Sequence, residues 1–146
     1  MDQYEERARG FVARMHKEWA EDVCGMMTPE FVEMDSEKMS LTLAYPVHPW
    51  ERNPDGVVHG GIMAAMIDTT MGTLTHAMCG VMTPTIHLDT AYLRPAPGDG
   101  TILIRAHLSL LGRGVIHADA LAWDSRDPDR PVAQAQGVFR RRSGGE

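Results

Sequence analysis

The stretch GGIMAAMIDTTMGTLTHAM, residues 60–78, decides the fold of this chain. Almost every residue in it is apolar or small, and Asp68 is its single acidic residue. A helix that is apolar nearly all round is buried over most of its surface. The stretch therefore predicts a long central helix. Its methionines are interpreted as core residues, because flexible thioether side chains fill irregular spaces.

Strand-like segments flank this helix in the sequence. Turn-forming segments rich in Gly, Pro and Asp separate them, which indicates short connections and an antiparallel sheet. A two-layer domain can bury such a helix only against its sheet. The predicted strands are residues 31–34, 39–45, 85–94, 101–111, 115–123 and 132–140.

The N-terminal segment predicts a second helix, over about residues 3–22, that covers one edge of the core. Apolar residues recur there at helical spacing between charged ones. The whole chain, 1–146, is thus expected to form one domain with a core from about residue 30 to 142. Its predicted class is α+β, an antiparallel β-sheet wrapped around one long central helix, with an extra N-terminal helix.

The composition argues against several classes of partner. The net charge is −6, and basic residues gather only at the terminal run 140–142, so a nucleic-acid binder is not expected. No apolar run is long enough to cross a bilayer, and the polar N-terminus does not resemble a signal peptide. Cys24 and Cys79 lie far apart and outside any CxxC motif, which favours free thiols in a cytoplasmic protein.

Common cofactor and catalytic motifs are also missing from the sequence. The histidines form neither HxH nor HExxH, so no metal site is expected. There is no GxSxG nucleophile motif, and the GRG turn at 112–114 is too short for a nucleotide-binding loop.

Candidate chemistry gathers in NPDGVVHGGIMAAMID, residues 53–68. His59-Gly60-Gly61 lies where the loop enters the central helix, and two glycines there let a ligand approach the backbone closely. The first N–H groups of a helix lack intrahelical partners and carry the positive end of its dipole. They could therefore polarise a carbonyl oxygen. Alternatively, the two glycines only allow the loop to pack tightly.

Asp68 is the second candidate, because a carboxylate on an apolar helix is unfavourable unless it is paired. A buried ion pair or a strand cap would explain it structurally, whereas a nearby oxyanion site would make it functional. Gly61 and Asp68 share a helix face but lie about 10 Å apart along the axis. A second copy of the helix, antiparallel across a two-fold axis, could supply the missing carboxylate.

The run N-x5-HGG-x6-D over residues 53–68, with Thr85 and then AYLRPAPGDG at 91–100, resembles one known family. It is similar to the hotdog-fold acyl-CoA thioesterases of the phenylacetic-acid-pathway type, over about residues 53–142. The resemblance implies a hotdog fold and hydrolysis of an acyl-CoA thioester to the free acid and CoA, without a cofactor. It also implies a homodimer or a dimer of dimers.

The same resemblance implies roles for five residues. The N–H of Gly60 binds the thioester oxygen, assisted by the side-chain amide of Asn53. His59 shapes the turn and is expected to hydrogen-bond to Asn53. Asp68, from the partner chain, is the nucleophile or general base, and Thr85 orients the attacking water.

Substrate contacts are implied on turns and strand ends. They are expected at Gly61, Arg94, Pro95 and the turn Gly112-Arg113-Gly114, with Arg141 or Arg142 contacting a CoA phosphate.

Two alternatives stay open. The first is a hotdog hydratase or dehydratase, which pairs its acid with a catalytic histidine. One turn beyond Asp68, this sequence has Gly72 and Thr73 and no histidine. A non-catalytic acyl-CoA-binding module would not need a carboxylate, so the presence of Asp68 favours an enzyme. The sequence does not specify the acyl group.

Overall fold

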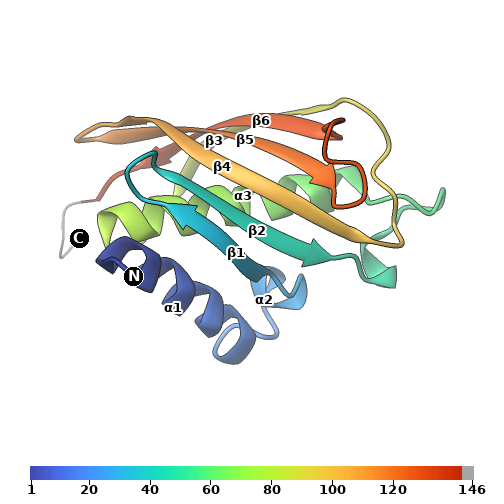
Figure 1. The fold of residues 1–146 in the computed structure, drawn as a ribbon, viewed down its shortest axis with the longest axis horizontal. Coiled ribbons are helices and arrows are strands. Elements are labelled where there is room, and N and C mark those ends of the chain that lie inside the picture. The colour runs from blue at the N-terminus through green and yellow to red at the C-terminus, as the bar shows by residue number, and fades with distance from the viewer. Residues whose placement is uncertain (143–146) are drawn as a thin grey trace.

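The computed structural model describes residues 1–142, so the expected domain end at residue 146 lies outside the described part. In this part, a six-stranded sheet curls over a long helix, α3 (Gly60–Cys79), and α1 (Gln3–Lys17) lies alongside α3 (Figure 1). The strand order is β1-β2-β4-β5-β6-β3, with antiparallel neighbours throughout, which confirms the predicted fold class. The strands are β1 (Glu30–Asp35), β2 (Ser40–Pro46), β3 (Thr85–Tyr92), β4 (Thr101–Leu111), β5 (Val115–Asp124) and β6 (Ala133–Arg140).

Helix α3 forms where its apolar composition predicts it. It ends because Gly80 adopts φ +77°, a conformation that L side chains rarely adopt, and the Gly80 N–H closes the last turn on the His76 carbonyl at 2.7 Å. The hydroxyl of Tyr45 on β2 donates to the Met66 carbonyl at 3.0 Å, so its polar atom is satisfied inside the core. The side chains of α3 that fill the core include Met63, Met66, Ile67, Met71 and Leu74.

The N-terminal helical segment is divided, which corrects the expectation of one helix over residues 3–22. Helix α1 begins at its cap Asp2, ends at Lys17, and is followed by a turn and a short helix, α2 (Val23–Met26). The chain reverses at Trp19, whose carbonyl accepts from the Asp22 N–H at 3.0 Å. Gly25 then packs directly on this turn, where a Cβ atom would lie 1.9 Å from the Trp19 carbonyl oxygen. Tertiary packing thus ends the helix although the apolar spacing continues.

Strand β3 is an edge strand, and it extends from one end of the sheet to the other. Thr85 pairs with Phe139 at one end, and Tyr92 pairs with Ala133 at the other. Within residues 1–142 the outer edge of β3 has no strand partner, and Ile86 on it is 57% exposed. No helix in that part of the chain is both long and apolar enough to span a membrane.

Candidate active site

The loop before α3 fixes the orientation of the Asn53 side chain. Its Oδ1 accepts from the N–H groups of Asp55 at 3.0 Å and Val57 at 3.3 Å. The Asn53 N–H also donates to the Val57 carbonyl at 2.8 Å, so the loop closes on itself. Because these bonds occupy the amide oxygen, the NH2 group is left to donate to another molecule.

Gly60 is the first residue of α3, and its N–H therefore has no partner within the helix. Its carbonyl accepts from the Tyr92 hydroxyl at 2.6 Å, which ties the helix start to the end of β3. Asn53 and Gly60 face a common cleft of about 420 Å³, here called the carbonyl cleft. Its lining includes Asn53, Gly60, Met63, Tyr92, Arg94 and Pro95.

His59 does not hydrogen-bond to Asn53, so that expectation is wrong. The His59 ring folds over the helix start, where its Nδ1 accepts from the Gly61 N–H at 2.9 Å. This bond uses the Gly61 donor and leaves that of Gly60 for a ligand. His59 thus acts as the N-cap of α3, a position usually taken by Ser, Thr, Asp or Asn.

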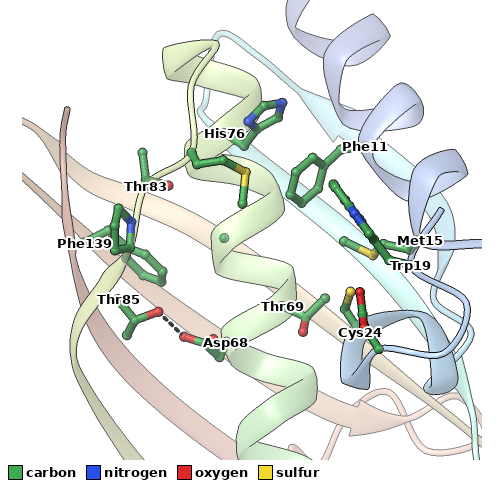
Figure 2. A pocket seen from close by; sticks show the side chains of 14 residues that line it. Phe11, Met15, Trp19, Cys24, Asp68, Thr69, His76, Thr83, Thr85 and Phe139 are labelled. Atoms are coloured by element: carbon green, nitrogen blue, oxygen red, sulfur yellow. Dashed lines mark hydrogen bonds between the residues drawn. The ribbon is translucent and has the colours of Figure 1, made fainter. Parts of the chain in front are cut away.

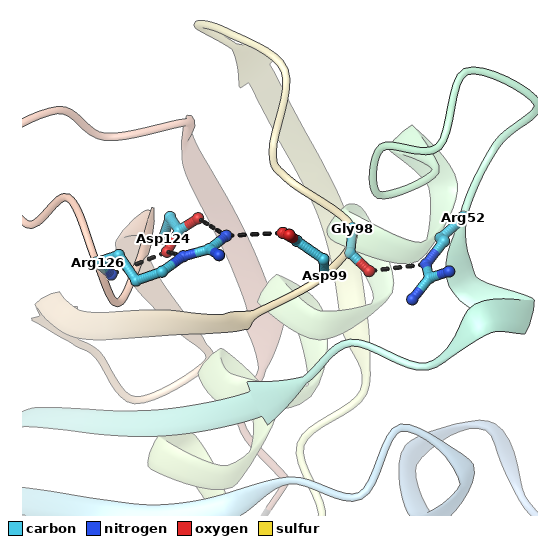
Figure 3. Close-up of polar contacts among 5 residues, drawn as sticks. All are labelled: Arg52, Gly98, Asp99, Asp124 and Arg126. Atoms are coloured by element: carbon cyan, nitrogen blue, oxygen red, sulfur yellow. Dashed lines mark hydrogen bonds and ion pairs between the residues drawn. The ribbon is translucent and has the colours of Figure 1, made fainter.

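A set of polar contacts joins the loops that carry residues of the carbonyl cleft (Figure 3). The Arg52 guanidinium donates to the Gly98 carbonyl at 2.7 Å, which joins the 53–58 loop to the 94–100 loop. The loops approach so closely that a Cβ atom at Gly98 would lie 2.3 Å from the Gly56 carbonyl oxygen. This approach places Arg94 and Pro95 beside Asn53.

Arg126 connects the 94–100 loop to the end of β5. Its guanidinium contacts the carboxylates of Asp99 and Asp124, each at 2.8 Å. Asp124 is buried, and the hydrogen bond from Arg126 holds its carboxyl pKa below the usual range. The contacts fix the start of β4 and the end of β5 against the 94–100 loop.

Asp68 lies two turns along α3, in a second cleft of about 340 Å³, here called the carboxylate cleft (Figure 2). The Thr85 hydroxyl donates to its Oδ1 at 2.6 Å, so the two side chains lie together. Asp68 is only half-buried within a single chain, although it lies on an otherwise apolar helix. The reason is that the α3 face bearing Asp68 is left open by the sheet.

The two clefts are separate within one chain. Gly60 and Asp68 are eight residues apart, which corresponds to about 12 Å along the helix axis. The two sets of lining residues have no member in common. The structure therefore brings Asn53, Gly60, Arg94 and Pro95 together, and separately joins Asp68 to Thr85.

The predicted substrate contacts in the Gly112-Arg113-Gly114 turn and at Arg141 and Arg142 lie at the other end of the sheet from Arg94. The Arg141 guanidinium donates to the Gly112 carbonyl at 3.1 Å, and its N–H donates to the Gly114 carbonyl at 2.9 Å. Arg113 and Arg142 are exposed beside this turn. The register places the turn at the Thr85 end of the sheet, because Val115 pairs with Arg140 and Thr85 with Phe139.

Comparison with known proteins identifies the family. The model of the thioesterase superfamily matches residues 55–129, more than half of the chain. The chain belongs to the thioesterase superfamily. The match includes the HGG turn, Asp68 and Thr85, and it confirms the resemblance drawn from these residues.

Several solved structures are similar to this chain in fold. A phenylacetic acid degradation-related protein from Ralstonia eutropha JMP134, described as a candidate thioesterase, is 28% identical with a TM-score of 0.76, over 89% of this chain and 98% of its own. The PaaI protein of the E. coli phenylacetic acid degradation operon has a TM-score of 0.81 at 16% identity, over 97% and 95% of the two chains. The smu.793 protein from Streptococcus mutans UA159, solved with acetyl CoA bound, has a TM-score of 0.69 at 20% identity, over 77% and 86%.

Two residues that hold the start of α3 in place were missed in the sequence. Tyr92 falls within the AYLRPAPGDG segment, yet its bond to Gly60 spans 32 residues and has no local signature. Glu51 is fully buried, and its carbonyl accepts from the His59 N–H at 2.8 Å. Its Oε1 accepts from the His48 N–H at 2.7 Å, and burial raises the pKa of the carboxyl group.

Across residues 1–142, no three His, Cys, Asp or Glu side chains gather as metal ligands.

Proposed function

We propose that this protein hydrolyses acyl-CoA thioesters to the free acid and CoA, at a site shared by two copies of the chain. The separation of the two clefts is the observation that carries the proposal. One cleft holds a carboxylate with a hydroxyl donor, and the other holds a helix-terminal N–H with a side-chain amide. Thioester hydrolysis needs both kinds of group at one carbonyl.

Two surfaces support an assembly that would unite the clefts. The open face of α3 carries small residues around and before Asp68, such as Gly61, Ala64 and Ala65, so a second helix could approach closely. The exposed edge of β3 could continue the sheet into a second copy. A two-fold axis there would bring each Asp68 to the other chain's Gly60 and create two equal sites. Pairing of such dimers into tetramers stays a prediction.

The proposed chemistry uses the chain's own groups and one water. The Gly60 N–H and the Asn53 amide stabilise the negative charge that develops on the thioester oxygen. Asp68 takes a proton from the water molecule while the water oxygen attacks the carbonyl carbon. The C–S bond then breaks, and the proton passes to the departing thiolate to give free CoA. Thr85, which donates to Asp68, keeps its lone pairs to hold the water.

Asp68 could alternatively attack the carbonyl carbon itself. The thiolate would then leave with a proton from solvent, and water would cleave the resulting acyl anhydride to restore the carboxylate. Label in Asp68 after one turnover in isotopically labelled water would establish the anhydride route, because only attack of water on the Asp68 carbonyl carbon of the anhydride puts label there.

The CoA portion is proposed to lie across the subunit boundary. Arg94 and Pro95 flank the carbonyl cleft, whereas Arg141 and the Gly112-Arg113-Gly114 turn lie at the opposite end of the same sheet. An antiparallel partner would bring its own turn to the Arg94 end, so both cationic groups could reach one CoA. A relative solved with acetyl CoA supports this choice of ligand.

A thiol-release assay over a panel of acyl-CoA esters tests the function. We expect release of the CoA thiol from at least one ester, with stoichiometric formation of the free acid. Absence of thiol release across the panel would contradict the proposal. The hydratase alternative is not supported by the carboxylate cleft, where His76 lies about 12 Å along α3 from Asp68 and stacks on Phe11.

A further inference from the structure

The carboxylate cleft extends well beyond the reacting groups. Asp68 and Thr85 lie at one end, and His76 lies eight residues further along α3 at the other (Figure 2). Helix α1 forms one wall and the segment before β3 forms the opposite wall. The large apolar side chains that line the cleft include Phe11, Met15, Trp19, Met82 and Phe139.

The charge of this cleft restricts what it can hold. Its ionisable carboxyl groups are Asp22 and Asp68, and none of the described residues that line it is Lys or Arg. Burial lowers the pKa of His76, whose ring stacks on Phe11 at 4.3 Å between ring centres. Arg7 and Arg14 act on the His76 ring from outside this lining, so no lining Lys or Arg would pair with a terminal carboxylate, whereas an uncharged apolar chain would be favoured.

Gly72 keeps the floor of the cleft open. It lies one turn beyond Asp68 towards His76, and a Cβ atom built there would meet nothing within 4 Å. Along the axis of α3, the floor from Asp68 to His76 is about 12 Å long. An extended chain advances roughly 1.2 Å per bond, so this length corresponds to roughly ten bonds.

We propose that the carboxylate cleft binds the acyl group of the substrate over Gly72, and that the preferred substrates carry uncharged, unbranched acyl chains of medium length. This inference rests on the proposed function, because it places the thioester carbon beside Asp68. A phenylacetyl group is too short to reach His76 and would leave the far half of the cleft unfilled.

The first experiment measures kcat/KM for straight-chain esters from acetyl-CoA to hexadecanoyl-CoA, with adipyl-CoA and phenylacetyl-CoA as comparisons. Each methylene buried in the cleft should raise kcat/KM about fourfold, the equivalent of about 0.8 kcal/mol. The rise should stop near the decanoyl ester, and adipyl-CoA should fall below hexanoyl-CoA. A flat profile, or a maximum at phenylacetyl-CoA or adipyl-CoA, would overturn the inference.

Variants at the floor and at the far end then test the position of the chain. Gly72→Leu should lower the ratio of decanoyl to butanoyl kcat/KM at least tenfold, whereas His76→Ala should move the optimum to longer chains. Gly10→Leu is the matched control, because Gly10 lies on α1 outside the cleft and also has nothing within 4 Å of its Cβ position. Opposite shifts from two variants cannot arise from a general loss of folded protein.

The outcomes separate this inference from the proposed function. If no ester is hydrolysed, the proposed function fails. If the esters are hydrolysed but both variants keep the wild-type length profile, the function stands and the acyl group lies elsewhere.

Discussion

Replacement of Asn53 by Asp separates the two roles that this residue could have. In the wild type, the Asn53 side-chain oxygen accepts from the N–H groups of Asp55 and Val57 at 3.0 and 3.3 Å. The carboxylate of Asn53→Asp can still accept these two bonds, but it has no N–H to donate. If the amide stabilises the oxyanion, the loss of one such donor should reduce kcat about 100- to 1000-fold, or about 2.7–4 kcal/mol. Stability should stay close to that of the wild type, because the loop bonds remain.

The companion variant Asn53→Ala removes the donor and the loop bonds together. Each lost bond should lower the free energy of unfolding by about 1 kcal/mol, and each kcal/mol should lower Tm by about 2–4 °C in a chain of this size. Thiol release measures the rate per folded molecule, and thermal unfolding measures stability. Gln3→Glu makes the same chemical change on exposed α1 and controls for the added charge. If Asn53→Asp keeps more than a tenth of wild-type kcat, Asn53 is a turn residue and not an oxyanion donor.

Three further predictions address the carboxyl groups. Asp68→Asn should abolish most thiol release while acyl-CoA binding, measured by calorimetry, persists; nearly full activity would exclude Asp68 from the chemistry. Glu51→Gln should raise Tm, and the gain should grow as the pH rises through and above the usual range of a glutamate pKa, because burial raises the Glu51 pKa and its ionisation destabilises the wild type; a gain independent of pH would contradict this cause. Arg126→Ala should lower Tm at neutral pH because it leaves Asp124 without its partner. Since Arg126 lowers the Asp124 pKa, that difference should shrink as acid protonates Asp124, and a constant difference would argue against the ion pair.

Much of the fold follows from the sequence, because apolar composition and turn chemistry are local properties. Helix α3 spans Gly60–Cys79, one residue longer than the apolar stretch predicts. The end of α1 could not be predicted in this way. Trp19 continues the helical spacing, but the chain turns there to pack Gly25 against the helix, which is a tertiary contact.

The candidate site could be predicted only in part, because some of its contacts join segments that are distant in the sequence. Motif spacing linked Gly60 with Asp68, and the helix rise indicated that they lie too far apart to serve one carbonyl within the same chain. The structure places them in different clefts. The sequence could not tell whether Asp68 is covered by its own chain or by another, because periodicity records only which residues are apolar. The bond between Tyr92 and Gly60 and the buried position of Glu51 depend on contacts between distant segments.

Complementation between two inactive variants tests the shared site most directly. Gly60→Pro removes the proposed backbone donor at the first position of α3, where helices tolerate proline, and Asp68→Asn removes the carboxylate. In a mixed dimer, one site would combine Gly60 from one parent with Asp68 from the other, and the second site would lack both. Differently tagged chains, co-expressed and purified through both tags, give this dimer free of its parents.

Purified mixed dimers are predicted to regain about half of the wild-type thiol release per dimer, because one of two equivalent sites is complete. Each parent alone should stay inactive while circular dichroism shows that it is folded. Mixed dimers as inactive as their folded parents would contradict the shared site, and Asp68 would then have to act within its own chain.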